Sequence, residues 1–195
     1  MGYTMGSNHS RHGHSHGRRW RITRWTAAGS LLLLPLLGMH FTDAVKWTAS
    51  DFVFASILLF GSLGAYELLV GRAPNAAYRA GLGLAILAIF LLEWINAAVG
   101  ITDGSADLAL ALSVPAVGLL GALMTGFEAR GLARTMFGTA LVPLCIGLIA
   151  LGAGLVPAHN PPFEILGITG FFAVLLLASG GLFRMAATRG PARIP

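Results

Sequence analysis

The residues with the most potential for chemistry are polar side chains inside long apolar stretches. Glu93 lies 13 residues after Ala80, which is about 20 Å along a helix at 1.5 Å per residue. A carboxylate at that depth in a membrane must be neutral, paired or hydrogen-bonded. Asn96 lies one turn further on the same helix face, and we expect Ser62 at a similar depth in the preceding stretch. These three residues form a candidate intramembrane polar site, serving either proton transfer and ligand binding or helix–helix contact.

Three further polar residues are weaker candidates. Glu67 lies four residues before Gly71, where its carboxylate could reach the membrane surface and meet an arginine. His40 and His159 both fall at ends of apolar stretches, and two imidazoles could ligate haem or a metal ion. No spacing motif supports that pair, so we expect no cofactor and no metal site.

Sequence motifs for catalysis are missing. The chain contains no Walker loop, dinucleotide fingerprint, HExxH, nucleophile elbow or CxxC, and each of these motifs places specific groups for a specific reaction. We therefore expect no catalytic residues and no enzymatic activity. The alternating histidines near the N-terminus could bind metal ions weakly, or belong to a basic tail held against anionic lipid.

The composition excludes an ordinary soluble protein. Hydrophobic residues make up 55% of the 195 residues and charged residues only 11%, whereas a soluble domain is about 25% charged. In lipid, backbone hydrogen bonds must be satisfied within helices or a closed barrel. The apolar stretches are continuous and lack the alternation of barrel strands, so the predicted fold class is an all-α membrane protein.

Six spans of roughly 20 residues are expected from the charge-free stretches. They are residues 25–42, 52–71, 80–102, 108–127, 135–156 and 165–183. Together they predict a transmembrane domain over residues 25–184, a bundle of about six helices with short loops. Residues 1–24 are predicted to be a disordered, basic, His-rich tail, and residues 185–195 a second tail. Asp51 and Asp107 are expected to cap the second and fourth spans.

The basic residues predict the orientation of these spans. Twelve of the thirteen Lys and Arg residues fall on one side, and only Lys46 falls on the other. Because basic residues concentrate in cytoplasmic loops, we expect a multi-pass protein of the bacterial inner membrane with both termini in the cytoplasm. Aromatic residues near the span ends predict interfacial belts; they are Trp20, Trp25, Tyr78, Phe127 and Phe183 at one side and Phe41, Trp47, Phe52 and Phe163 at the other.

One alternative concerns the first span. Arg18 and Arg19 before an apolar stretch are also typical of a secretory signal. Cleavage would leave five spans and an outer N-terminus. Against it, the stretch is 18 residues long and is not followed by a clear small-x-small cleavage site.

Four short runs, residues 93–101, 162–166, 170–173 and 182–184, resemble an uncharacterised family of small multi-span bacterial inner-membrane proteins. The similarity extends over residues 25–184. The resemblance implies a multi-span inner-membrane protein and carries no assigned activity. The position of Glu93 is usually apolar in that family, which argues against a catalytic or transport role for it.

The sequence favours an accessory or interaction subunit in the membrane. Small residues recur through the spans and permit close helix packing. The expected partners are the lipid bilayer and other membrane proteins or a second copy, and no nucleic acid is expected because the basic residues follow the topology. Two alternatives stay open: a small transporter or proton-coupled channel using Glu93 and Asn96, and a haem- or metal-binding subunit using His40 and His159.

Overall fold

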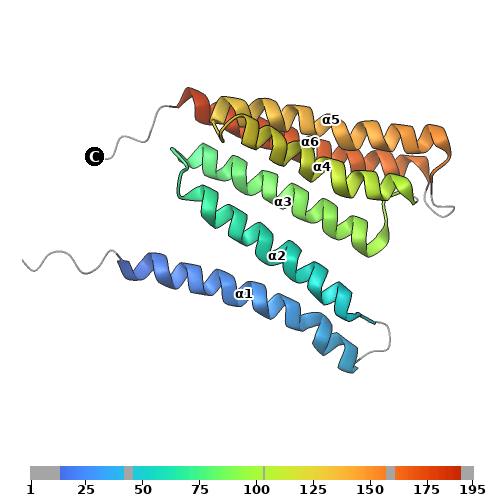
Figure 1. Cartoon of the computed structure of the whole chain (residues 1–195), viewed down its shortest axis with the longest axis horizontal. Coiled ribbons are helices and arrows are strands. Elements are labelled where there is room, and N and C mark those ends of the chain that lie inside the picture. Colours follow the sequence, from blue (N-terminus) through green and yellow to red (C-terminus); the bar gives the residue numbers. More distant parts are fainter. Residues whose placement is uncertain (1–13, 42–45, 103, 157–160, 190–195) are drawn as a thin grey trace, which may run out of the picture. The chain divides into compact units, whose positions relative to one another are not determined.

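The computed structural model describes residues 14–41, 46–102, 104–156 and 161–189. Every regular element among these residues is an α-helix, and no strand occurs there. The helices are α1 (His14–Phe41), α2 (Ala49–Val70), α3 (Ala76–Val99), α4 (Ser105–Met124), α5 (Ala129–Ala153) and α6 (Pro162–Thr188) (Figure 1). Within the described ranges all six are long and apolar enough to cross a membrane. The predicted fold class is confirmed, and the chain is a multi-pass membrane protein.

The helices extend past several predicted span ends. α1 begins at His14, so residues 14–24 are helical where we expected a disordered tail. α5 begins at Ala129 and α6 continues to Thr188, so both helices include arginines near their ends. Arginine is a good helix former, and its long side chain can carry the charge to the membrane surface. Counting only charge-free residues therefore places the starts of α1 and α5 too late and the end of α6 too early.

The start of α2 shows how the expected cap is made. Thr48 precedes the helix, and its backbone N–H donates to Asp51 Oδ2 at 2.7 Å. The Asp51 N–H lies 3.4 Å from Thr48 Oγ1. This reciprocal arrangement is a capping box, in which two N–H groups left unpaired by the helix are satisfied. Thr48 is therefore the N-cap residue of α2. Asp51, which we expected to cap this helix, accepts the hydrogen bond from within its first turn.

The chain divides into two units, Met1–Leu63 and Gly64–Pro195. In the first unit α1 is joined to most of α2. The rings of Trp25 and Phe60 stack with their centroids 5.7 Å apart. The buried residues described in this unit are Ala28 and Ala55. The stacked rings of Trp25 and Phe60 are therefore one contact between these two helices.

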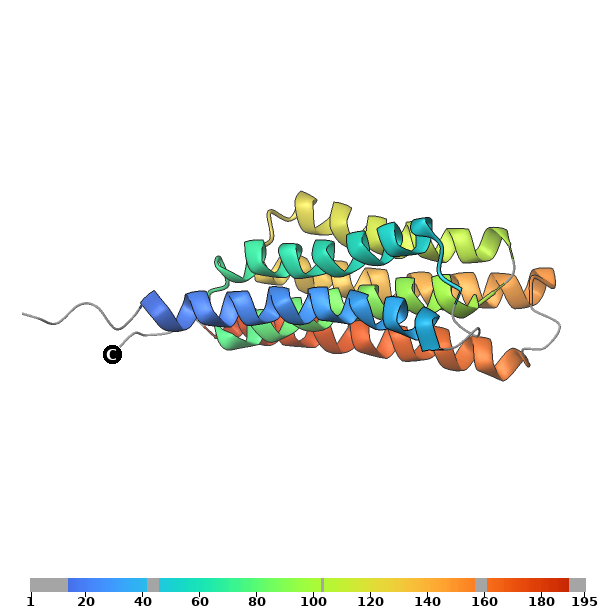
Figure 2. The same cartoon turned by 90° about the horizontal axis from the view of Figure 1, so that it is seen from below.

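The second unit holds α3, α4, α5 and α6, which run side by side in both views (Figures 1 and 2). The most extensive contacts join α5 to α6, followed by α3 to α6 and α4 to α5. Its largest fully buried side chains include Leu92, Leu110, Phe172, Leu176 and Phe183. In lipid such packing supplies most of the association energy, because apolar surface gains little by leaving hydrocarbon.

Glycines provide the close approaches inside this unit. A Cβ added at Gly81 would lie 3.3 Å from Phe183, and one at Gly147 would lie 3.0 Å from the side chain of Thr169. Other glycines of the same spans face open space, including Gly138, Gly167, Gly170 and Gly181. The prediction that small residues serve internal packing holds for the first group and not for the second.

Two aromatic residues expected at the membrane surface point into the unit instead. Tyr78 and Phe183 are 4% and 1% exposed, and their rings meet edge to face at 5.2 Å. The Tyr78 hydroxyl donates to the Phe127 carbonyl at 2.8 Å. A tyrosine can be buried in this way when its hydroxyl finds a partner. This contact holds the short α4–α5 turn, in which Phe127 has a φ of 60°.

Candidate functional site

The predicted intramembrane site lies closer to a helix end than expected. Glu93 is six residues before Val99, the last residue of α3, which is about 9 Å along the helix axis. The helix ends there because Gly100 adopts a φ of 75°, which favours glycine. We predicted that this span continues to residue 102, whereas the helix ends at Val99.

Asn96 bonds to the neighbouring helix. Its Nδ2 donates to the Asp107 carbonyl at 3.0 Å. Two other atoms, Glu93 Oε1 and Asn96 Oδ1, are buried and receive no hydrogen bond from the part of the chain that the structure describes. Both are acceptors, and they lie three residues apart on α3. A proton or a donor group would satisfy this pair of oxygens.

Asp107 organises the connection between α3 and α4. Its Oδ1 accepts hydrogen bonds from the backbone N–H of Ile101 at 3.1 Å and of Thr102 at 2.7 Å. It also accepts from the Thr102 hydroxyl at 2.8 Å. Gly104, which has no side chain, occupies the capping position of α4. Asp107 therefore does not cap α4 as predicted; it reaches back and fixes the preceding turn.

The glycine at the end of α3 makes room for this carboxylate. A Cβ added at Gly100 would lie 3.0 Å from Asp107 Oδ2. Ile101 and Thr102 then turn inward and are 0% and 2% exposed. The polar residues at this end of α3 and α4 thus serve largely to build the turn.

The other predicted site residues belong to other segments of the chain than α3. Ser62 belongs to the first unit, eight residues before the end of α2. Glu67 lies one turn before the end of α2 and is half-buried. His40 is exposed in the last turn of α1, and His159 lies outside the described residues. Within the described ranges, no three His, Cys, Asp or Glu side chains are placed to hold a metal ion.

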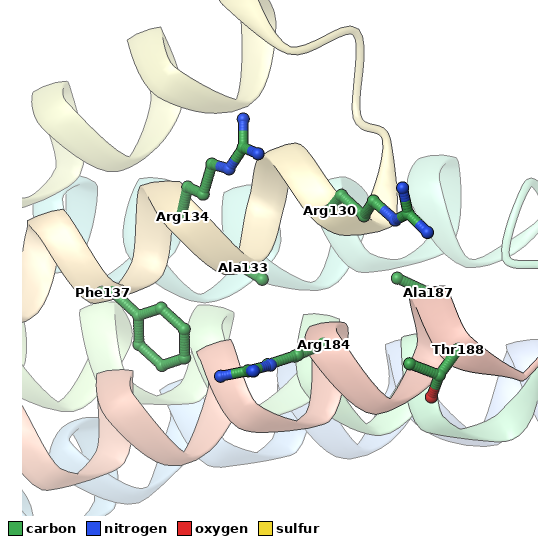
Figure 3. A pocket seen from close by; sticks show the side chains of 7 residues that line it. All are labelled: Arg130, Ala133, Arg134, Phe137, Arg184, Ala187 and Thr188. Carbon is green, nitrogen blue, oxygen red and sulfur yellow. The ribbon is translucent and has the colours of Figure 1, made fainter.

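A second polar site lies at the opposite ends of the helices, between the start of α5 and the end of α6. Here a pocket of about 330 Å³ opens at the surface. We call it the basic pocket; its lining residues are Arg130, Ala133, Arg134, Phe137, Arg184, Ala187 and Thr188 (Figure 3). Figure 3 shows Arg184 of α6 extending toward Phe137, whereas Arg130 and Arg134 project from α5.

Packing inside the unit holds both walls of the basic pocket. A Cβ added at Gly180 would lie 2.7 Å from the ring of Phe137, so the absence of a side chain lets this ring rest against α6. Asn75, which caps α3, donates through Nδ2 to the carbonyls of Ala186 and Arg189, at 3.0 Å each. The end of α6 is thereby tied to the start of α3.

The sequence indicated these arginines as topology markers but not as a site. Arg130 and Arg134 are four residues apart and share one helix face. Arg184 lies 50 residues further on. The pocket could have been predicted from the order of the spans, because two successive antiparallel helices place the start of the first beside the end of the second.

No protein-family model, curated protein or solved structure matches the chain. The resemblance to a family of small bacterial inner-membrane proteins finds no support in these comparisons. Its coarse implication, a multi-span protein, agrees with the six candidate spans of the described residues. The roles of individual residues therefore rest on their own geometry.

Proposed function

We propose that the chain is a non-enzymatic membrane subunit that acts by packing against the transmembrane helix of another membrane protein. The supporting observation is the outer face of α6, where Phe163, Gly167, Gly170, Phe171 and Val174 lie at helical spacing. Phe163 and Val174 are 72% and 63% exposed. Apart from their own turn of α6, no described atom would lie within 4 Å of a Cβ added at Gly167 or Gly170.

Glycine on this face favours a protein partner over lipid. In a helix glycine is about 1 kcal/mol less favourable than alanine, and a fluid acyl chain gains nothing specific from the missing Cβ. A neighbouring helix does gain, because its backbone can come close and pack. At two other glycines of the unit the chain fills the notch itself, with Thr169 at Gly147 and Phe137 at Gly180.

The test is site-specific photocrosslinking from position 174 in native membranes, with products identified by mass spectrometry. We expect adducts to a transmembrane segment of one other membrane protein, lost when Gly167 and Gly170 are both replaced by isoleucine. Gly138→Ile is the matched control, since Gly138 also faces open space, on α5. Adducts to a second copy would identify self-association instead. Adducts that persist in the double isoleucine variant, or adducts to lipid alone, contradict the proposal.

For the location we propose the bacterial inner membrane, with both termini in the cytoplasm. The support is the charge pattern along the helices. Every arginine lies in the N-terminal half of α1, at the N-terminus of α3 or α5, near the C-terminus of α6, or in the adjoining segments. Reporter fusions after residues 74 and 189 should both report the cytoplasm, and a fusion after residue 104 the opposite side. Any other pattern contradicts this orientation.

A second candidate function is proton or ligand passage at Glu93 and Asn96. The observation that favours it is the pair of buried oxygens without a hydrogen-bond donor among the described residues. Proton flux into liposomes should fall to background in Glu93→Gln and stay unchanged in Glu164→Gln, a carboxylate exposed at the start of α6. Background flux in the unmodified protein would refute this function.

A further inference from the structure

The basic pocket gathers positive charge that nothing in the described chain neutralises. Arg130, Arg134 and Arg184 are all exposed, and none of them forms an ion pair with a carboxylate of the described residues. Arg130 and Arg134 are also like charges four residues apart on one helix, which is unfavourable by itself. An anion in the pocket would relieve this repulsion.

The position of the pocket indicates where that anion comes from. α5 has 25 residues, about 37 Å at 1.5 Å per residue, which exceeds the roughly 30 Å hydrocarbon core of a bilayer. Arg130 and Arg134 lie in its first two turns, and Arg184 lies four residues before the end of α6. The three guanidinium groups therefore fall at the depth of lipid headgroups.

The surface beside the arginines is apolar and continues along the helices. Phe137 lines the pocket, and Leu141, one turn further along α5, is 59% exposed. On α6, Leu177 lies two turns before Arg184 on the same face and is 44% exposed. A free phosphate ion would use the arginines only. A phospholipid would contact both the arginines and the apolar surface. Its phosphate would lie on the arginines, and an acyl chain would lie along Phe137 and the two leucines.

We propose that the basic pocket binds the headgroup of an anionic phospholipid. Guanidinium groups match phosphate oxygens through paired N–H donors, and basic pockets between transmembrane helices are suited to acidic headgroups. A zwitterionic headgroup is a poorer ligand, because its ammonium group would be brought among three arginines. None of the three arginines belongs to the α6 surface proposed for a partner helix.

The test uses the full-length protein and native mass spectrometry of lipid binding from detergent. The probes are phosphatidylglycerol and phosphatidylcholine of identical acyl chains. We expect the first phosphatidylglycerol to bind at least about tenfold more tightly than phosphatidylcholine, since each arginine near such a headgroup adds a sizeable attraction. Replacing Arg130, Arg134 and Arg184 together by glutamine should reduce this ratio to about two or less.

The matched control replaces Arg72, Arg79 and Arg189 by glutamine, which removes the same net charge from exposed positions outside the pocket. This control should keep the tenfold preference. Arg184→Gln alone should lower the preference several-fold, and it serves if the triple variant does not fold as judged by circular dichroism. Equal preference in the pocket variants and the unmodified protein overturns the proposal. So does displacement of the lipid by millimolar inorganic phosphate, which would identify a site for the free ion.

Discussion

Replacing Asp107 by alanine should destabilise the protein by about 3 kcal/mol. The carboxylate accepts three hydrogen bonds, two of them from the backbone N–H groups of Ile101 and Thr102. These two residues are at most 2% exposed, so water cannot take over. A buried donor without a partner costs about 1–3 kcal/mol, and two such N–H groups at the middle of that range, with some relaxation of the turn, give the expected loss.

The measurement is equilibrium unfolding in mixed dodecyl maltoside and SDS micelles, followed by far-UV circular dichroism. Asp107→Asn keeps an acceptor oxygen of the same shape and loses only the charge, so its loss should be about 1 kcal/mol. Asp51→Ala is the control, because Asp51 also accepts hydrogen bonds in the first turn of a helix. Its partners are exposed, so water can replace the carboxylate and the loss should be smaller.

The test depends on the relative size of the three losses in stability. A loss below about 0.5 kcal/mol for Asp107→Ala, which is the range of ordinary surface substitutions, would refute the anchoring role of Asp107. The same holds if Asp51→Ala costs as much as Asp107→Ala. In that case the buried turn contributes no more than an exposed cap does.

Four further substitutions test the helix contacts, the first three by the same unfolding measurement and the fourth by amide exchange. Gly121→Ala should lose about 1–3 kcal/mol because its Cβ would run into a threonine of α5, whereas Gly138→Ala, facing open space, should gain up to about 1 kcal/mol; similar values for both would refute the close approach. Ser179→Ala removes a buried 2.8 Å bond to the Gly81 carbonyl and should lose about 1 kcal/mol, with no loss counting against the bond. Asn75→Ala removes three hydrogen bonds and should speed amide exchange in the last turn of α6, which unchanged protection there would contradict.

The number and type of the elements could be predicted from the sequence because lipid imposes a length. Six apolar stretches of about 20 residues leave few other solutions. The helix ends could not be predicted in the same way. Arg130, Arg134 and Arg184 ended the predicted spans, yet they lie inside α5 and α6, because arginine tolerates a helix that leaves the hydrocarbon core. The basic pocket was missed for this reason.

The candidate polar site was only partly accessible from the sequence. Asn96 and Glu93 do share one face of α3, as helical spacing requires. The partner of Asn96 is a backbone carbonyl, which no residue pattern reveals. The role of Asp107 likewise depends on the turn at Gly100, where φ is 75°. The burial of Tyr78 could not be predicted from the sequence, because the partner of its hydroxyl is also a backbone carbonyl.

Because α3 packs against α6, the helices of this unit cannot finish packing until α6 has been synthesised. α3 leaves the ribosome early, but α6, the described helix that it contacts most, is synthesised only after α4 and α5. Until then the amide of Asn75 lacks its carbonyl partners and the ring of Tyr78 lacks Phe183. Because segments inserted first must wait for those that follow, a nascent chain stopped after α5 exposes an unfinished surface to membrane quality-control proteases. Insertion of α6 into the membrane then covers this surface of α3.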